Sequence, residues 1–373
     1  QNLPSEVDKM SNRFTNNNEV PVIFGTSEIN SNTHNQIICN ADIFASIFFM
    51  ISRWEEYVNP NKDFHLRFSA FDSHAYKFNY LDRPLVDEYI DFLWNILLEL
   101  GIDYKRKTNL KKVYNSHDID SIYTWQSWKQ ILRVAIGDII KRKNITLARK
   151  NIVEYFSIKN NLIKEPYDTF DYLMDISEKN NIKSRFYFMS NGQTSYDKRY
   201  DINDKKCIQY IQNIKNRGHI IGFQASYNTY LDSNLLKNEK DQLELAINMK
   251  VKEGRGHYLR FSVPYTWQLW DDCGMEIDST CGYANKEGFR CGTGNEYSVF
   301  NILTREQLQL KERPLIVMDC TMLVYQQFTD NERNKIIKHI TDNNSDFTML
   351  WHNSQITNLD FYNNILEILI NDN

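Results

Sequence analysis

The feature that most constrains the fold is an alternation of short apolar runs with longer amphipathic runs, which begins near residue 110. Helical periodicity is clearest over residues 205–216, 235–252 and 331–341. Strands separated by helices lie parallel in one sheet, because each helical crossover carries the chain back to the same end of the sheet. About seven such units favour a closed barrel over an open sheet. The predicted strands are residues 112–116, 184–189, 219–224, 258–263, 275–279, 315–320 and 347–351.

The first part of the chain has a different pattern. Residues 1–108 predict a smaller N-terminal α/β domain, and residues 109–373 predict the larger domain that contains the alternating elements. The run at 20–25 predicts a strand that ends at a glycine turn. Asp42 is placed to cap the apolar helix that follows it, and residues 82–100 predict a second helix.

Composition excludes several classes of protein. A net charge of −4 gives no electrostatic reason to expect nucleic acid or an anionic membrane as a partner. The six cysteines contain no Cys-x-x-Cys pair, which is typical of reduced thiols in a cytoplasmic protein. No apolar run approaches the roughly 20 residues of a membrane-spanning helix. Because the sequence opens at Gln1 and not at methionine, we expect an incomplete N-terminus.

A long basic insertion follows the first predicted strand, over residues 123–162. Its cations could favour an anionic partner, although a solvated helical face is the favoured interpretation. They are Lys129, Arg133, Lys141, Arg142, Lys143, Arg149 and Lys150.

Polar side chains capable of chemistry occur in six segments, five of which follow or end a short apolar or β-branched run. In α/β folds, sites are built at the carboxyl ends of the strands. We therefore expect the six segments to meet in one active site. They are residues 116–120, 218–228, 257–260, 278–280, 288–292 and 350–353.

Asp118 and Asp120 end the first predicted strand of this series. Residues two apart on a strand face the same side, so both carboxylates can enter one pocket. Two like charges at so short a distance repel each other and raise the pKa of one carboxyl group. This gives a base beside a metal ligand. A pair of helix N-cap residues is the alternative interpretation.

Together these segments resemble the polysaccharide deacetylases, the metal-dependent NodB-like carbohydrate esterases of family four. They look most like a bacterial branch with an extra N-terminal domain and a His-Asp-x-Asp first motif, and residues 48–57 look like that companion domain. The resemblance implies a distorted (β/α)7 barrel over about residues 110–373. It also implies a divalent metal, usually zinc, and removal of N-acetyl or O-acetyl groups from an amino sugar, nucleotide-sugar or glycan in surface polysaccharide biosynthesis.

The resemblance implies a role for each matching residue. Asp118 would be the general base and Asp120 a metal ligand, with Gln224 and Asn228 at the family's two metal-binding histidine positions. Amide oxygens suit calcium or magnesium better than zinc, and Asn228 fits the closer branch while Gln224 does not. Either zinc has been lost, or Gln224 is an engineered inactivating change, or other ligands serve. His117 and His257 are the available substitutes.

Arg260 would hold Asp118 ionised, and His352 would protonate the leaving amine. Arg290 would contact a carboxylate or phosphate of the substrate, or else form a loop salt bridge. The remaining candidates for substrate contact are Tyr227, Asp278 and Trp351.

Two functions of different classes follow. The first is a carbohydrate deacetylase. The second is a deacetylase-like barrel that binds a glycan or a glycan-assembly partner without chemistry, which Gln224 favours. Aromatic side chains near the strand ends would serve either function, because rings stack on sugar faces. They are Tyr227, Tyr230, Tyr265, Trp267 and Trp351.

Overall fold

A nine-stranded sheet forms the centre of the molecule in the computed structural model, which describes residues 3–33, 36–107, 110–197, 200–326 and 328–371. All neighbouring strands are parallel except β10 and β11, which form an antiparallel pair at one edge. In spatial order they are β10 (Tyr297–Asn301), β11 (Glu306–Glu312), β9 (Ile277–Asp278), β8 (Glu253–Gly256), β7 (Ile220–Ala225), β6 (Arg185–Phe188), β5 (Val113–Ile119), β13 (Phe347–Leu350) and β12 (Val317–Met318).

Seven consecutive strands of this sheet, from β9 across to β12, are parallel, and six of them, all except β8, are strands that the alternating pattern predicts. The sheet curls, so that a backbone hydrogen bond of 3.1 Å from Leu315 N to Cys281 O joins the segments flanking β12 and β9. Within the described part of the chain, β9 and β12 share no strand ladder. The parallel sheet is confirmed, and closure into a barrel is not.

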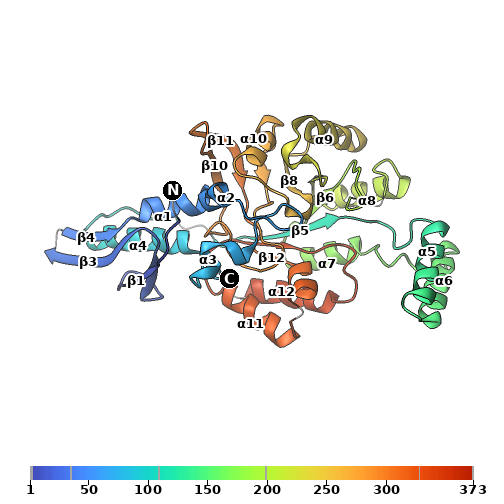
Figure 1. The fold of residues 1–373 in the computed structure, drawn as a ribbon, viewed down its shortest axis with the longest axis horizontal. Helices are drawn as coiled ribbons and strands as arrows, with labels where there is room; N and C mark the ends of the chain where they lie inside the picture. The colour runs from blue at the N-terminus through green and yellow to red at the C-terminus, as the bar shows by residue number, and fades with distance from the viewer. Residues whose placement is uncertain (1–2, 34–35, 108–109, 198–199, 327, 372–373) are drawn as a thin grey trace.

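Helices between the strands cover the sheet (Figure 1). Helix α8 shows why: Cys207, Ile211 and Ile214 recur at helical spacing and are buried, while Asp204 caps the first turn by accepting from Lys206 N. The covering helices are α7 (Phe170–Lys179), α8 (Lys205–Asn216), α9 (Ser233–Ile247), α10 (Tyr265–Asp272), α11 (Asp330–Thr341) and α12 (Leu359–Asn371). Short turns follow β7 and β12, namely η2 (Thr229–Leu231) and η4 (Thr321–Tyr325).

The N-terminal part is a mixed α/β unit with its own apolar core. Asp42 accepts a hydrogen bond from Ala45 N and caps α1, as predicted. Tyr283, from the larger part of the chain, is buried in the same core. The predicted boundary at residues 108–109 lies outside the described residues and stays a prediction. The elements are β1 (Asp8–Ser11), β2 (Glu19–Val22), β3 (Gly25–Thr33), β4 (Gln36–Ala41), α1 (Ile43–Ile51), α2 (Trp54–Val58), η1 (Ala70–Asp72), α3 (His74–Lys77) and α4 (Leu85–Glu99).

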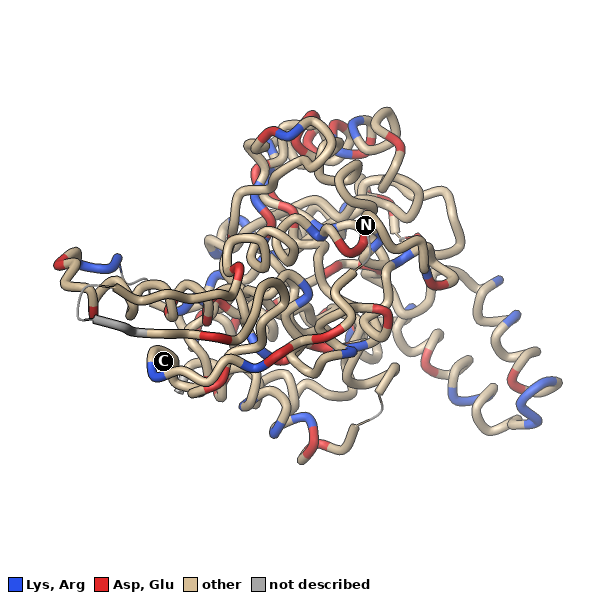
Figure 2. The backbone as a smooth tube through the Cα atoms, turned by 60° about the vertical axis from the view of Figure 1, so that its left-hand side comes forward, with Lys and Arg blue, Asp and Glu red and all other residues tan. Residues whose placement is uncertain are grey.

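The basic insertion forms a helical hairpin of α5 (Trp128–Ile140) and α6 (Ile145–Lys159). It stands away from the body of the molecule, beyond the end of β5 (Figures 1 and 2). Across the described residues, no helix combines the length and apolar character that a membrane crossing requires.

The predicted strand at 258–263 is wrong. This segment begins with the short turn η3 (His257–Leu259), and Tyr258 and Leu259 have positive φ values of 60° and 54°, which a strand does not allow. The strand is β8, whose two glycines and polar residues conceal it in the sequence. A Cβ atom on Gly254 would lie 2.0 Å from Phe223 O of β7, so close strand approach requires glycine here.

Candidate active site

A pocket of about 240 Å³ lies at the carboxyl ends of β5, β8, β12 and β13. Its chemically active lining consists of Asp118, Asp120, His257 and His352, so four of the predicted residues meet there. The other lining residues are Arg67, Tyr258, Leu259, Met318, Cys320, Val324, Tyr325 and Leu350. One wall is therefore apolar, and Arg67 brings a residue of the N-terminal part to the site.

Asp118 forms a buried ion pair with Arg255. Arg255 Nη1 donates to Asp118 Oδ1 at 2.7 Å, and Nη2 donates to Ser116 Oγ at 3.0 Å and Ser279 Oγ at 3.1 Å. Arg255 Nε donates to Ser279 O at 2.8 Å, so the guanidinium is fixed on three sides. Burial raises the pKa of Asp118 above its ordinary value, and the charge of Arg255 opposes that rise.

Asp120 is the point at which the other polar groups converge. Its Oδ1 accepts from Gln224 Nε2 at 2.9 Å and lies 3.3 Å from His257 Nε2. Its Oδ2 lies 3.7 Å from His352 Nε2. Burial favours the neutral acid, but the positive charge of His257 outweighs it and holds the pKa of Asp120 well below its usual range.

His257 lies between two carboxylates. Its Nδ1 is 3.6 Å from Asp197 Oδ1, on the side opposite Asp120. Burial opposes the charged imidazole, but Asp120 and Asp197 outweigh this and raise the pKa of His257 to about 9. The ring is therefore an imidazolium at neutral pH.

His352 is oriented by Asp319, which follows the end of β12. His352 Nδ1 lies 2.8 Å from Asp319 Oδ1, and the backbone N of His352 donates to Oδ2 at 2.7 Å. A carboxylate only accepts, so Nδ1 carries the proton and Nε2 faces Asp120. Burial disfavours the imidazolium, but Asp319 outweighs this and raises the pKa of His352 well above its ordinary value.

Aromatic rings gather beside the pocket, at the junction with the N-terminal part. His65 Nδ1 and Tyr227 Oη are 2.9 Å apart. Tyr227 stacks on Tyr196 with ring centroids 4.7 Å apart, and Tyr258 meets Tyr227 edge-on at 5.4 Å. Tyr258 lines the pocket itself. The predicted aromatic Tyr227 thus belongs to a four-ring cluster near the site.

Arg260 does not pair with Asp118, so that prediction is wrong. Its guanidinium donates to the backbone oxygens of His65 (3.0 Å) and Tyr227, and it lies over the ring of Tyr227. Asn228 is exposed, and its Oδ1 accepts from Arg260 at 3.5 Å. Arg260 therefore holds the aromatic cluster in place, and Asn228 belongs with it.

The predicted metal ligands Asp120, Gln224 and Asn228 do not fit a metal in this arrangement. Gln224 presents its N–H to Asp120, while its buried Oε1 has no hydrogen-bond partner among the described residues. Asn228 contacts Arg260 instead. We therefore derive no catalytic step through a metal ion.

A second group of candidate ligands lies at the pocket wall. Asp319, Cys320 and His352 have ligand atoms within 4.8 Å of one another, the one such group among the described residues. However, the 2.8 Å between Asp319 Oδ1 and His352 Nδ1 is a hydrogen-bond distance, and two ligands of a tetrahedral zinc lie about 3.3 Å apart. Burial also raises the pKa of the Cys320 thiol. As arranged, the group is a hydrogen-bonded pair and not a chelate.

Two predicted site residues belong to the core. His117 points to the face of β5 opposite Asp118, where Nδ1 lies 2.8 Å from Trp351 O and Nε2 lies 3.3 Å from Ser184 Oγ. Burial lowers its pKa to about 3, so it is a neutral packing residue and not a substitute ligand. The side chain of Trp351 is buried against Tyr362, with ring centroids 5.2 Å apart, and offers no ring to a substrate.

Asp278 and Arg290 also lie in the interior, away from the residues that line the pocket. Asp278 accepts from Thr280 N at 3.0 Å, and burial raises its pKa to about 7. Arg290 Nε donates to Glu56 Oε1 at 2.8 Å, in an ion pair buried between the two parts of the chain. The salt-bridge alternative for Arg290 is correct, and substrate contact by either residue is not supported.

Sequence reasoning missed Arg255, Asp319 and Asp197. Asp319 follows an apolar run in the same way as Asp118, so the strand-end rule that found the other segments could have found it. Arg255 was hidden because its strand is rich in glycine. Asp197 lies in a loop between β6 and α8 and has no such signal.

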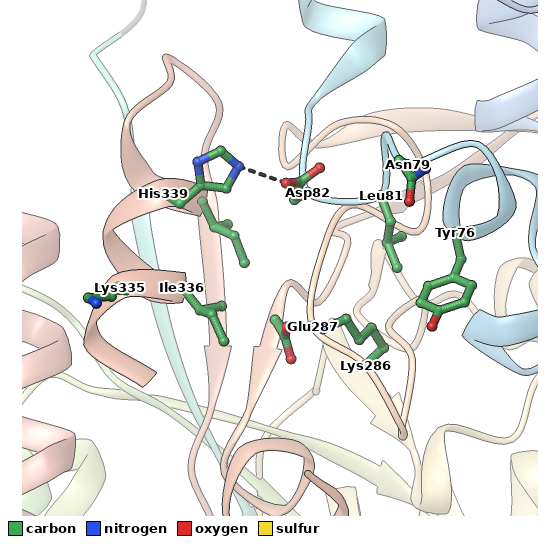
Figure 3. Close-up of a pocket in the computed structure, with 10 residues that line it drawn as sticks. Tyr76, Asn79, Leu81, Asp82, Lys286, Glu287, Lys335, Ile336 and His339 are labelled. Carbon is green, nitrogen blue, oxygen red and sulfur yellow. Dashed lines mark hydrogen bonds and ion pairs between the residues drawn. The ribbon is translucent and has the colours of Figure 1, made fainter. Parts of the chain in front are cut away.

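A second pocket, of about 360 Å³, lies between the N-terminal part and α11 (Figure 3). His339 Nε2 and Asp82 Oδ2 are 2.7 Å apart at its rim. None of the predicted site residues lines it. It is therefore separate from the candidate active site.

Comparisons with known proteins give limited matches. Residues 3–102 match a family of unknown function, DUF7033. No curated protein matches the chain.

Several solved structures are similar. A protein described as a putative polysaccharide deacetylase from Mycobacterium smegmatis is 11% identical, with 72% of this chain and 88% of that chain covered and a TM-score of 0.45. A chitin deacetylase from Colletotrichum lindemuthianum is 11% identical, with 71% and 84% covered and a TM-score of 0.39. A CE4 family pseudoenzyme from Bacillus anthracis is 9% identical, with 70% and 61% covered and a TM-score of 0.37. At these TM-scores the likeness assigns no residue roles.

Proposed function

We propose that this chain is a hydrolase that removes an acetyl group from an amino sugar or glycan. One observation carries the proposal: Asp118 and His352 line one pocket, and each is oriented by a buried, oppositely charged partner. A base and an acid held on opposite sides of a substrate are what hydrolysis of an amide requires. The substrate class comes from the resemblance of the sequence motifs to polysaccharide deacetylases.

Asp118 is the proposed general base. Arg255 holds Oδ1, which leaves Oδ2 to accept a proton from a water molecule in the pocket. The water oxygen then forms a bond to the carbonyl carbon of the acetamide. Burial of the carboxylate strengthens it as a base, while Arg255 keeps it ionised and correctly turned.

His352 is the proposed general acid. Asp319 fixes Nδ1, so the proton on Nε2 faces the pocket. As the carbon–nitrogen bond breaks, Nε2 gives this proton to the leaving nitrogen. The products are acetic acid, which ionises to acetate in water, and a free amine; one water proton is left on Asp118 and His352 is left neutral.

His257 supplies positive charge next to the reacting carbonyl group. Its imidazolium form, held between Asp120 and Asp197, stabilises the negative charge that develops on the carbonyl oxygen. The apolar wall and Tyr258 face a sugar ring or the acetyl methyl group.

The test uses two probes, N-acetylglucosamine oligomers and p-nitrophenyl acetate, with acetate or nitrophenol release as the readout. We expect Asp118→Asn to lower kcat roughly a hundredfold or more. Asp241→Asn, on the exposed surface of α9, is the matched control and should be unchanged. Equal release by the unsubstituted protein and by Asp118→Asn would reject the proposal.

Binding of a glycan without chemistry is the second candidate. Gln224, which stands where the family has a metal-binding histidine, favours it. In this case the oligomers would bind, as measured by calorimetry, while no acetate is released from any probe. Substitution of Tyr258 by Ala would then weaken binding, and Asp118→Asn would leave it unchanged.

A further inference from the structure

The α5–α6 hairpin exposes an apolar stripe that nothing in the proposed hydrolase chemistry uses. On α5 the stripe consists of Trp128, Leu132, Ile136, Ile139 and Ile140, at successive spacings of four, four, three and one. All five side chains are exposed, Trp128 by 58% and Ile140 by 69%. Residues at these spacings lie on one face of a helix, so they form a continuous strip.

Helix α6 carries a matching strip. Ile145, Ile152, Val153 and Phe156 are exposed and lie along one face of the helix. Few side chains of the two helices are buried, and some of these are small. They include Ile131, Ala135 and Ala148. Two neighbouring helices that leave this much apolar surface in water mark an interaction site.

The same hairpin is strongly basic. Residues 123–162 contain eight Lys or Arg and two Asp or Glu, a net charge of +6 in a chain whose total is −4. One of the two acids, Asp138, is itself paired with Arg142. Basic residues gather at the outer end of the hairpin, the end farthest from the body (Figure 2). The overall charge of the chain therefore conceals a local cation cluster.

We propose that the hairpin docks onto an anionic lipid surface, with its apolar stripe in the interfacial region. An apolar strip with Trp and Phe, flanked by Lys and Arg, is the pattern of helices that lie in a membrane interface. The long stems of Lys129 and Arg133 let their charged ends reach the headgroups while the stripe is buried. A second copy of this chain would bring two hairpins of +6 together, and their repulsion opposes that occupant.

Docking of the hairpin would also set the position of the candidate active-site pocket relative to the lipid surface. The chain runs from Asp120, at the end of β5, to Trp128 at the start of α5 within eight residues. The base of the hairpin is tied down, because Thr124 N donates to Glu165 Oε1 at 2.8 Å and Trp125 Nε1 donates to Glu154 Oε2 at 3.1 Å. A bound hairpin therefore holds the carboxyl end of β5 close to the lipid surface.

The test is sedimentation of the full chain with two kinds of vesicle, phosphatidylcholine alone and equal parts of phosphatidylcholine and phosphatidylglycerol. We expect binding to the anionic vesicles that weakens as salt is raised, and little binding to phosphatidylcholine. The variant Lys141→Gln, Lys143→Gln, Lys150→Gln removes three exposed cations and should bind about a hundredfold more weakly, at about fivefold for each. Trp128→Ser with Ile140→Ser should also lose binding.

The matched controls replace lysines and an apolar residue on other parts of the surface. Two control variants alter exposed residues outside the hairpin and should bind as the unsubstituted chain does. One combines Lys237→Gln, Lys311→Gln and Lys338→Gln, and the other is Leu245→Ser alone. Circular dichroism checks that every variant keeps its helices. Absence of anionic binding, or equal binding by the hairpin variants, would overturn the proposal. So would a concentration-dependent dimer that Trp128→Ser with Ile140→Ser abolishes.

Discussion

Arg255 Nη1 and Asp118 Oδ1 lie 2.7 Å apart in an ion pair from which water is almost wholly excluded. Strands β8 and β5, which carry the two residues, are not neighbours in the sheet, so the pair spans the site across β6 and β7.

Removal of the Arg255 side chain should destabilise the folded protein. We expect Arg255→Met to lower the free energy of unfolding by about 3–5 kcal/mol, because it leaves a buried carboxylate without its partner. Urea denaturation measures the change. Arg260→Met is the informative control, since Arg260 does not contact Asp118 and its loss should leave the pH dependence of hydrolysis intact. If Arg260→Met shifted that pH profile while Arg255→Met did not, our assignment of the two arginines would be reversed.

Zinc binding should respond to residue 224. Gln224→His places an imidazole against Asp120, where the amide now donates at 2.9 Å. We expect the variant to bind zinc at least about 10–100-fold more tightly than the unsubstituted chain, in competition with a chelator at fixed pH. Gln209→His, at an exposed position of α8, controls for zinc capture by any added histidine. Equal affinities for the unsubstituted chain and Gln224→His would mean that residue 224 is not a ligand position.

Asp319 should act through His352. In Asp319→Asn the amide cannot hold the Nδ1 proton as the carboxylate does, so the imidazolium form and its orientation are both lost. We expect kcat to fall about a hundredfold with little change in KM, and the pH profile to move toward lower pH. Cys320→Ser, next to the same ring at 3.8 Å, should change kcat little. A fall in kcat for Cys320→Ser as large as that for Asp319→Asn would point to general disruption of the pocket.

Acid should destabilise the protein through Glu56. Burial favours its neutral form, but Arg290 and Arg53 outweigh this and lower the pKa of Glu56 from 4.5 to about 2. Because the folded-state pKa is depressed, this stabilisation is fully present above pH 4.5 and is lost as the pH falls toward 2. Glu56→Gln should lose a few kcal/mol at pH 7 and show a flatter decline over that acid range, measured by thermal unfolding at each pH. An unchanged slope would exclude Glu56 as the titrating group.

Much of the sheet follows from local pattern. Helix α8 has the predicted bounds, 205–216, because its apolar spacing, its cap and the glycine after it all agree. Asp118 and Asp120 do share a pocket, as strand alternation requires. The same alternation places His117 on the opposite face, so its exclusion from the site was also available from sequence.

The predictions that were wrong concern features that depend on contacts between segments far apart in the sequence. Phe261 and Val263 alternate with polar residues as a strand would, but they are buried beside a turn, while the true strand carries glycines that only the approach of β7 explains. Arg290 has no local sign that its partner is Glu56, which lies more than two hundred residues away. Burial and charge pairing of this kind are set by the tertiary fold, and one sequence does not reveal them.

The buried pair of Glu56 and Arg290 has a consequence for any attempt to shorten the chain. A protein that began after residue 110 would lose Arg67 from the pocket wall and would leave the Arg290 guanidinium in an apolar interior without an anion. Tyr283 would lose the core that now surrounds it. The two parts are therefore not exchangeable modules, and the part that carries Asp118 and His352 would be obtained intact only together with its N-terminal companion.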